Sequence, residues 1–255
     1  MSMEWRLLDL MTADCYTQMA IDEAIAYARG RGEAPPSIRL YRWKPSAVSI
    51  GCFQSLEDEV DLEACRRLGV DVIRRISGGG AVFHDYDGEI TYSLIADEGN
   101  RLIPADISES YRVICDGIIE AMRLLGLESE FKPINDVIVG SQKISGNAQT
   151  RRYGSVLQHG TVLVDLPSRT MFTVLNVSKE KISDKAIKQA EDRVTTIRRE
   201  LGRFVSFSEV RDALVSGFEK TLGISLVPGQ LSKEENELVS KFRERYASRE
   251  WLHLR

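Results

Sequence analysis

Hydrophobic and polar positions along the chain alternate with two different periods, which predict strands in some segments and helices in others. Short apolar or alternating runs typical of strands cover residues 5–10, 38–43, 47–51, 70–73, 81–84, 89–96, 137–139 and 155–165. Helical spacing covers residues 16–30, 61–68 and 108–125. The last of these helices places Ile114, Ile118 and Leu125 on one apolar face. The first 165 residues therefore predict an α+β fold in which one mixed sheet is flanked by helices.

The remaining residues follow a mainly helical pattern. Residues 171–177 are predicted to be helical, and a charged stretch at 179–194 has the mixed signs of a solvated face. Two capping boxes, Ser206 with Glu209 and Ser232 with Glu235, indicate the starts of two further helices. We expect one domain over residues 1–255, with a sheet-based core at 1–165 and a helical extension at 166–255.

Composition narrows the classes of protein that fit. A chain of 255 residues with 43% hydrophobic content can bury one large core, and a net charge of −4 without a basic block argues against nucleic acid as a partner. Neither a secretory leader nor an apolar run of about 18 residues is visible, so we expect a cytoplasmic protein without membrane contact. The four cysteines lack a C-x-x-C pair and fit neither a disulfide framework nor a zinc site.

A run of three glycines, Gly78, Gly79 and Gly80, follows Arg74 and Arg75 and lies between two predicted strands. Glycine lets main-chain N–H groups approach an anion closely, and arginine adds a planar donor fork for phosphate or carboxylate. The run matches neither the dinucleotide-binding fingerprint nor the Walker loop. A plain hairpin turn is the simpler alternative for this motif alone.

A second motif contains Asn135, Asp136 and Lys143, with small residues after the lysine. Lys143 could contact both an α-phosphate and an acyl carbonyl, and Asp136 could hold Mg2+ on the pyrophosphate side. The simpler alternative is a solvated lysine on a hairpin. The occurrence of both motifs in one chain favours a site for an activated acyl group.

Together with the segment QHGT at residues 158–161, these motifs resemble the lipoate–protein ligase A family of the biotin/lipoate ligase and octanoyltransferase superfamily. The resemblance implies a largely antiparallel sheet and a short form without the C-terminal accessory domain. It implies a catalytic role for Lys143 and a metal-binding role for Asp136. The ligand-binding positions that it implies are Arg74, Gly78, Gly79, Gly80, Ala81, Val82, Phe83, His84, Asn135, Lys143, Ser145, Gly146, Ala148, Gly160 and Thr161.

The resemblance implies ATP-dependent ligation of lipoate, through lipoyl-AMP and with Mg2+, to a lysine of an acceptor protein. The expected acceptors are the lipoyl domain of a 2-oxoacid dehydrogenase E2 and the glycine-cleavage H protein. A separate polypeptide could supply the missing accessory domain as a subunit.

Three alternatives stay open. Octanoyltransferases of this superfamily act without ATP through a cysteine upstream of the lysine motif, and residues 127–143 contain none, which favours the ligase. A biotin ligase would carry a different arginine-rich loop, and a binding protein without chemistry would not need Arg74, Asp136 and Lys143 together. His84 and His159 lack metal-ligand spacing and a clear nucleophile partner, so each is most simply a hydrogen-bonded imidazole at a strand end.

Overall fold

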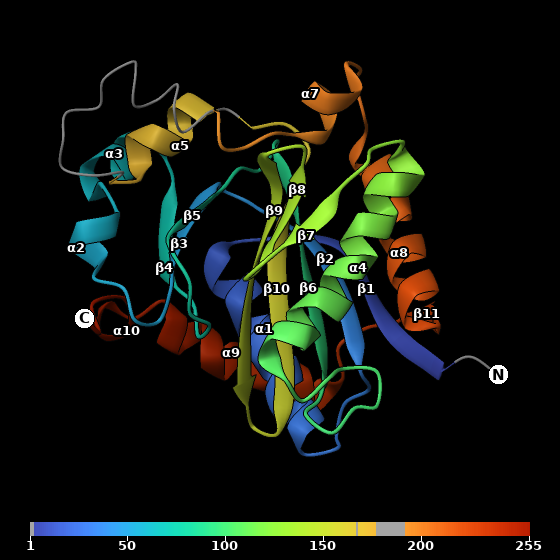
Figure 1. Ribbon diagram of the computed structural model, residues 1–255. Coiled ribbons are helices and arrows are strands. Elements are labelled where there is room, and N and C mark those ends of the chain that lie inside the picture. The colour runs from blue at the N-terminus through green and yellow to red at the C-terminus, as the bar shows by residue number, and fades with distance from the viewer. Residues whose placement is uncertain (1–2, 167, 177–191) are drawn as a thin grey trace.

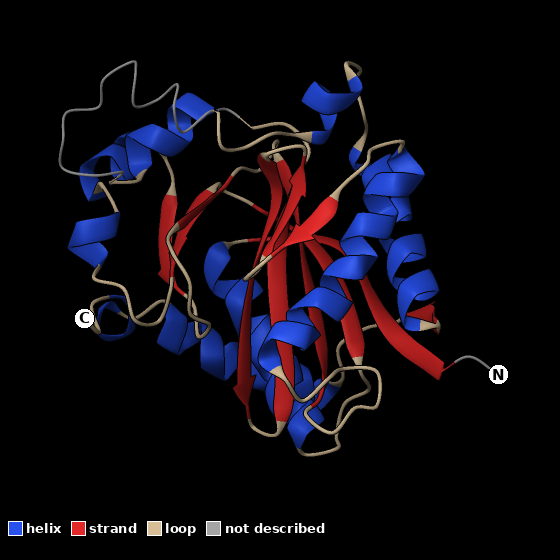
Figure 2. Cartoon of the chain, in the orientation of Figure 1, coloured by secondary structure: helices blue, strands red, loops and turns tan. Residues whose placement is uncertain are grey.

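The chain folds around a large mixed sheet with a smaller sheet beside it, as the computed structural model shows in Figures 1 and 2. The structure describes residues 3–166, 168–176 and 192–255. Helices cover both faces of the large sheet, and the smaller sheet carries its own short helices. The predicted α+β class with a largely antiparallel sheet is confirmed.

The large sheet has eight strands in the order β11-β1-β2-β6-β10-β9-β8-β7. Their bounds are β1 Met3–Ala13, β2 Ser37–Trp43, β6 Glu89–Asp97, β7 Glu130–Lys132, β8 Asp136–Val139, β9 Gln142–Arg152, β10 Ser155–Leu163 and β11 Ile224–Pro228. β1 pairs in parallel with both β2 and β11, and the pairs from β2 to β7 are antiparallel. The small sheet has the order β4-β3-β5, with β3 at Ala47–Ile50, β4 at Asp71–Arg74 and β5 at Val82–His84.

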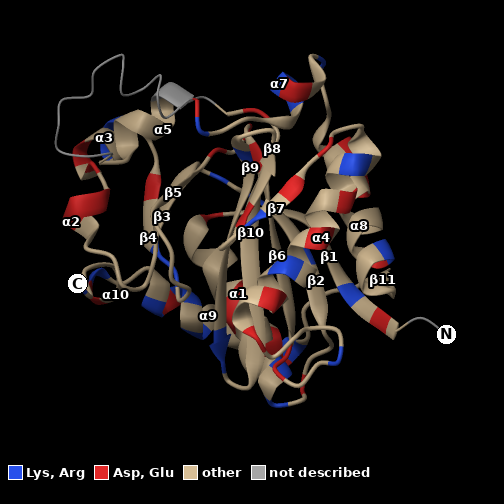
Figure 3. Ribbon diagram, viewed as in Figure 1, with Lys and Arg blue, Asp and Glu red and all other residues tan. Residues whose placement is uncertain are grey.

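In the part of the chain that the structure describes, four long helices enclose the large sheet. α4 (Ile107–Leu125) and α8 (Phe207–Leu222) pack on one face, and α1 (Cys15–Gly30) and α9 (Lys233–Tyr246) pack on the other. The shorter helices are α2 Leu56–Glu59, α3 Leu62–Leu68, α5 Ser168–Val174, α7 Ile197–Leu201 and α10 Arg249–Leu252. Acidic and basic side chains intermingle over the elements in view (Figure 3).

Local sequence explains where the helices begin and end. The side chain of Asp106 accepts a hydrogen bond from the N–H of Glu109 at the start of α4, and Gly126 ends this helix in the left-handed conformation. At the start of α9, Ser232 and Glu235 form both halves of the predicted capping box. At the start of α8, the structure has the half in which Ser206 accepts from the N–H of Glu209.

Two features of the fold differ from the sequence predictions. The strands of the first 165 residues form two sheets instead of one, because β3, β4 and β5 build a separate core with residues of α2, α3 and α5. The helical extension also contains a strand, β11, which pairs with β1 at the opposite end of the chain. The charged stretch at 179–194 lies mostly outside the described residues, which resume at 192.

These long-range contacts bear on domain organisation. Besides the pairing of β11 with β1, Arg6 of β1 forms a buried ion pair with Glu235 of α9, at 2.6 Å. We propose that residues 1–255 form one domain, because the extension completes the sheet of the core. No described helix combines the length and apolar character needed to cross a membrane.

Candidate active site

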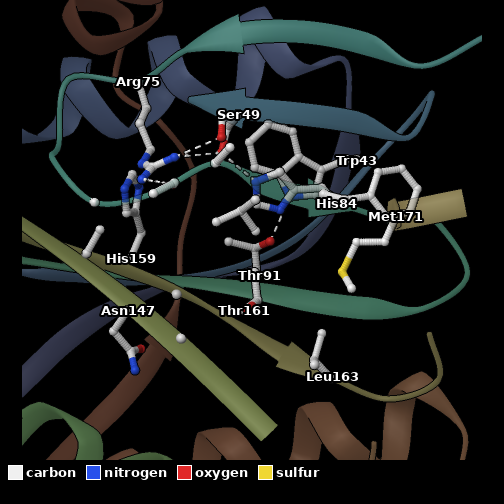
Figure 4. Close-up of a pocket in the computed structure, with 18 of the residues that line it drawn as sticks. Trp43, Ser49, Arg75, His84, Thr91, Asn147, His159, Thr161, Leu163 and Met171 are labelled. Atoms are coloured by element: carbon white, nitrogen blue, oxygen red, sulfur yellow. Dashed lines mark hydrogen bonds between the residues drawn. The ribbon is translucent and has the colours of Figure 1, made fainter. Parts of the chain in front are cut away.

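A pocket with a cavity volume of about 280 Å³ lies between the small sheet and strands β6, β9 and β10 of the large one (Figure 4). The glycine loop between β4 and β5 forms one wall, and β9 with Lys143 forms the opposite wall. The pocket therefore brings together the two sequence motifs, which are about sixty residues apart in the chain.

Arg75 is buried against the glycine loop and reaches the pocket. Its guanidinium donates to the carbonyl oxygens of Ser49, Gly78 and Gly80 at 2.9, 2.7 and 2.7 Å, and to the hydroxyl of Ser77 at 3.1 Å. All these acceptors are neutral, and burial lowers the pKa of Arg75 to about 10. A buried cation without a carboxylate partner is suited to an anion or a developing oxyanion.

The glycine loop allows this close approach of the guanidinium. Gly79 has a φ of 92°, and a Cβ atom there would lie 3.0 Å from the Nη2 atom of Arg75. A larger residue would therefore be strained in its backbone and would crowd the guanidinium. This is the physical reason for a glycine at the centre of the motif.

Lys143 projects from β9 beside its neighbour strand. Its ammonium group forms an ion pair of 2.7 Å with Asp136 of β8. A Cβ atom on Gly146 would lie 2.4 Å from the Nζ atom of Lys143, so only glycine leaves room for this position of the lysine. The backbone of Lys143 also accepts from Thr195 and donates to Arg193, which ties the chain after residue 191 to the site.

Two asparagines fix the wall formed by β9. The side chain of Asn147 donates to the carbonyl of Asn135 at 2.9 Å, and Asn135 donates in return to the carbonyl of Asn147. Tyr92 donates to the side-chain oxygen of Asn147 at 2.7 Å. A Cβ atom on Gly160 would lie 2.1 Å from that same oxygen. The small residue at 160 therefore preserves the network that holds both motifs in place.

His84 lines the pocket and belongs to a chain of hydrogen bonds, of which Figure 4 shows the contact with Ser49. Its Nε2 atom lies 2.8 Å from the hydroxyl of Ser49, and its Nδ1 atom lies 2.7 Å from the carboxylate of Glu89. The ring stacks on Trp43 with the centroids 4.0 Å apart. A serine, an imidazole and a carboxylate thus lie in the order that nucleophilic catalysis uses.

His159 forms a similar chain on β10. Its Nε2 atom lies 2.7 Å from the hydroxyl of Ser77, and its Nδ1 atom lies 3.1 Å from the carboxylate of Asp22. Burial lowers the pKa of His159, although Asp22 acts in the opposite direction. Asp22 also forms a buried ion pair with Arg39 and accepts from Ser93 at 2.6 Å. In this second chain, Arg39 therefore compensates the negative charge of Asp22.

The other end of the pocket is apolar. Trp43, Leu163 and Met171 lie there (Figure 4), and Leu166 and Leu175 add to the apolar lining. Trp43 is held by a hydrogen bond of 2.7 Å from its indole N–H to Thr91. An apolar lining that leads toward a buried cation suits a hydrocarbon chain with a polar head group.

Most ligand-binding positions expected from the sequence lie in this pocket. Those that line it are Gly79, Gly80, Ala81, Val82, Phe83, His84, Asn135, Lys143, Gly146, Ala148, Gly160 and Thr161. The residues that the structure does not place in the lining are Arg74, Gly78, Ser145 and Asp136. Gly78 still accepts a hydrogen bond from Arg75, and Asp136 pairs with Lys143.

Arg74 is buried on the opposite side of its strand. It donates to the carbonyl of Gln54 at 2.6 Å and to that of Leu252 at 2.9 Å, so it fastens the C-terminal helix to the small sheet. Successive side chains of a strand point to opposite faces, so only one of the two adjacent arginines can face the pocket. Arg75 is that residue, and this alternation was the available signal.

Sequence reasoning did not assign Ser49, Trp43 or Asn147 to the site. The pairing of β3 with β5 brings Ser49 beside His84, whereas Trp43 lies on β2 of the large sheet and stacks on the same ring. No local motif marks either residue. Asn147 lies within the second motif between two predicted positions, and its side chain bonds to Asn135 and Tyr92, a contact that no local pattern marks.

The magnesium-binding role expected for Asp136 stays a prediction, because Mg2+ is often held by one or two carboxylates together with substrate phosphates. Among the described residues, no group of three or more His, Cys, Asp or Glu side chains is arranged to hold a metal ion. The carboxylate of Asp136 is paired with an ammonium group, which competes with a cation for it.

All four cysteines of the chain are buried, and none lines the pocket. Burial raises the pKa of Cys15 strongly, that of Cys65 to about 11 and that of Cys115 to about 12. These thiols remain protonated at neutral pH and are poor nucleophiles. Cys52 lies near the glycine loop, where its N–H donates to the carbonyl of Ser77.

Comparison with known proteins identifies the family. Residues 14–219 match the lipoyl protein ligase A/B catalytic domain. Octanoyltransferase LipM of Symbiobacterium thermophilum is 38% identical over 274 residues, covering 98% of both chains. Octanoyltransferase LipM of Kyrpidia tusciae is 37% identical and covers 97% of both, and that of Bacillus subtilis is 34% identical and covers 98% of both.

Solved structures show the same fold. The bipartite lipoate protein ligase of Thermoplasma acidophilum, solved in a study of an archaeal lipoylation system, has a TM-score of 0.88 and 32% identity, covering 99% of this chain and 98% of that one. A lipoate-protein ligase A bound with ATP has a TM-score of 0.84 and 30% identity, covering 98% and 99%.

The relatives correct the expected reaction. Curated relatives that match over nearly their whole length are named octanoyltransferases, so the expectation of ATP-dependent lipoate ligation through lipoyl-AMP is wrong. That expectation depended on the lack of a cysteine in one segment. A thioester donor, however, already carries an activated acyl group. The lack of a cysteine in that segment therefore does not decide whether the reaction needs ATP. The match over residues 14–219 and the full-length relatives establish that this chain belongs to the lipoyl protein ligase A/B catalytic domain family.

Proposed function

We propose that this protein transfers an octanoyl group from a carrier-bound thioester to the ε-amino group of a lysine on an acceptor protein, without ATP. The observation that carries the proposal is the similarity of the whole chain to octanoyltransferases. The pocket supports it, because an apolar end large enough for a hydrocarbon chain leads to the cationic groups of Arg75 and Lys143.

The geometry suits acyl transfer at a thioester carbonyl. The apolar residues would hold the acyl chain, and the carbonyl carbon would lie near the glycine loop. Attack on this carbon produces a negatively charged oxygen, which Arg75 or Lys143 could stabilise by donating a hydrogen bond. Both side chains are already held in place, Arg75 by neutral acceptors and Lys143 by Asp136.

The acceptors that we propose are the lipoyl domain of a 2-oxoacid dehydrogenase E2 and the glycine-cleavage H protein. The Thermoplasma acidophilum ligase that this chain resembles was studied together with its E2 lipoyl domain, which supports the first of them. That ligase is described as bipartite, so a second polypeptide belongs in the test as a separate arm.

The test is the intact mass of apo lipoyl domain after incubation with the protein and octanoyl-acyl carrier protein, without nucleotide. We expect the mass to increase by one octanoyl group. The same incubation with free octanoate alone should leave the acceptor unmodified. Modification only when octanoate and Mg-ATP are supplied, with or without a second polypeptide, would refute the proposal.

A further inference from the structure

A buried chain of serine, histidine and carboxylate begins at Ser49. Binding of an acyl group does not by itself require such a chain. Transfer between two protein carriers is simpler when the acyl group is first moved to the enzyme, because the carriers can then visit the pocket one after the other. A cysteine usually provides such a nucleophile, yet the four thiols of this chain lie outside the pocket lining. Another side chain in the pocket must take the acyl group if transfer is covalent.

We propose that Ser49 is the residue that becomes acylated, with His84 as its base and Glu89 as the partner that orients His84. This inference depends on the proposed acyltransferase function. Ser49 lies on β3, and its side chain meets that of His84 on the neighbouring strand β5. Both residues line the pocket, so the hydroxyl is buried from solvent but lies next to the space for the acyl group.

The surrounding donors favour the hydrogen-bond direction that activation needs. Arg75 can only donate, and its Nη1 atom lies 3.1 Å from the hydroxyl oxygen of Ser49. The hydrogen of Ser49 is then free to point at the Nε2 atom of His84, 2.8 Å away. The Nδ1 atom of that ring correspondingly donates to Glu89. Arg75 would also stabilise negative charge on the serine oxygen during attack.

The carboxylate of Glu89 is free to stabilise a protonated His84. Within the described part of the chain, His84 is the ion-pair partner of Glu89, and the second carboxylate oxygen is buried without a hydrogen bond. Thr91 donates to the first oxygen at 2.8 Å and fixes its position. An otherwise unpaired buried carboxylate favours the imidazolium that forms when His84 takes a proton.

The second chain, through His159, is less suited to this role. Ser77 is fully buried and does not line the pocket, so its hydroxyl is not placed to meet a carbonyl there. The charge of Asp22 is already compensated by Arg39. This difference selects the chain at Ser49 and makes Ser77 a matched control.

The reaction balances in two steps. In the first, the oxygen of Ser49 forms a bond to the thioester carbonyl carbon, the C–S bond breaks, and the serine proton passes through His84 to the departing thiolate. In the second, the neutral amine of the acceptor lysine forms a C–N bond, and the C–O bond to Ser49 breaks. His84 then returns a proton from the amine to the serine oxygen, so no oxidant or nucleotide is needed.

The experiment traps the intermediate. The protein is mixed with octanoyl-acyl carrier protein without acceptor, quenched in acid and digested with trypsin, and residues 43–66 are sequenced by mass spectrometry. We expect an octanoyl ester on Ser49 that disappears when apo lipoyl domain is added before the quench. A variant with both Cys52→Ala and Cys65→Ala should keep the adduct, which excludes acylation of the two thiols in the same peptide.

Rates in matched variants complete the test. Ser49→Ala should lose about 100-fold or more of the transfer rate, whereas Ser77→Ala should change it only a few-fold. Ser49→Cys should keep the adduct as a hydroxylamine-sensitive thioester, which shows that the fold tolerates substitution at this position. If the wild type modifies the acceptor while Ser49→Ala is equally active and no adduct forms, the inference fails and the proposed function stands. If the wild type takes no octanoyl group from the thioester donor, both fail.

Discussion

At the scale of single residues, two adjacent arginines have different tasks. Arg74 and Arg75 are both buried, yet Arg74 donates to carbonyls of the C-terminal helix and Arg75 to those of the glycine loop. Arg74 is the last residue of β4 and Arg75 follows it, and the alternation of side chains continued past the strand end separates them. A substitution of Arg74 should therefore act on stability, and one of Arg75 on the reaction. The dipeptide alone does not show which arginine serves which purpose.

Lys143 gives a direct test of the charge requirement. Replacement by methionine keeps most of the side-chain volume but removes the ammonium group that could stabilise the oxyanion. We expect Lys143→Met to lower the transfer rate by about 100-fold while thermal unfolding changes little, because the side chain is 39% exposed. Steady-state transfer from octanoyl-acyl carrier protein measures this. Lys132→Met, at an exposed position of β7, should behave as the wild type, and equal rates for both variants would contradict the assigned role.

His159 should make stability depend on pH. Burial lowers its pKa in the folded state, so below about pH 6.5 the unfolded chain takes up a proton that the folded chain refuses. The free energy of unfolding should therefore fall between pH 7.5 and 5.5, by at most about 1.4 kcal/mol per pH unit. The pKa of Asp22 is lowered as well, and its contribution is lost only under more acidic conditions.

Urea unfolding at several pH values measures this dependence. His159→Asn should flatten it, because the asparagine can donate to Asp22 without titrating. His253→Asn, at an exposed position near the C-terminus, is the matched control and should leave the slope unchanged. An unaltered slope in His159→Asn would show that other groups cause the pH dependence.

At the scale of elements, glycines set the distance between α4 and α8. A Cβ atom on Gly117 would lie 2.4 Å from the ring of Phe218, and one on Gly217 would lie 2.3 Å from the carbonyl oxygen of Gly117. Glycine is unfavourable inside a helix, so its presence at both positions reflects this close approach. The two helices thereby cover the face of the sheet opposite α1 and α9.

Gly117→Ala should weaken this packing. The added methyl group must displace Phe218, which we expect to lower the free energy of unfolding by about 1–3 kcal/mol. Transfer activity per folded molecule should stay the same, because neither helix lines the pocket. Gly99→Ala, where a Cβ atom meets nothing within 4 Å, is the control for the substitution itself. Equal stability of the two variants in urea unfolding would contradict the packing argument.

Elements with strong local patterns could be predicted from the sequence. α4 has an apolar face and a terminal glycine, and α9 has a capping box. The separate small sheet and β11 could not be predicted in this way. Both depend on which strands pair, and β11 meets β1 across more than 200 residues, which no local period encodes.

At the scale of the whole molecule, the site is assembled from both sheets. The glycine loop and the lysine strand could be recognised because each is a continuous motif. The serine, histidine and carboxylate of the proposed relay come from three strands, and only the tertiary fold brings them into contact. The prediction of an ATP-dependent reaction, made from the missing cysteine, was wrong for a related reason. One segment without a nucleophile does not define the chemistry of a pocket that several segments form.

The two ends of the chain are joined by the buried ion pair of Arg6 with Glu235. Arg6→Met should leave a carboxylate buried without its partner, which we expect to lower the free energy of unfolding by about 3–5 kcal/mol. The exposed pair of Arg203 with Glu209 is the control, and Arg203→Met should lower the free energy of unfolding far less. Similar losses in the two variants, measured by urea unfolding, would show that the buried pair does not fasten α9 to the sheet.

The proposed function depends most on the identity of the acyl donor. A competition between two possible donors tests this identity most directly. Apo lipoyl domain is incubated with the protein, deuterated octanoyl-acyl carrier protein, unlabelled octanoate and Mg-ATP together, and the mass of the modified acceptor is read. We expect the deuterated mass, at a rate that removal of ATP does not change. An acceptor that carries the unlabelled octanoyl group, and only when ATP is present, would contradict it.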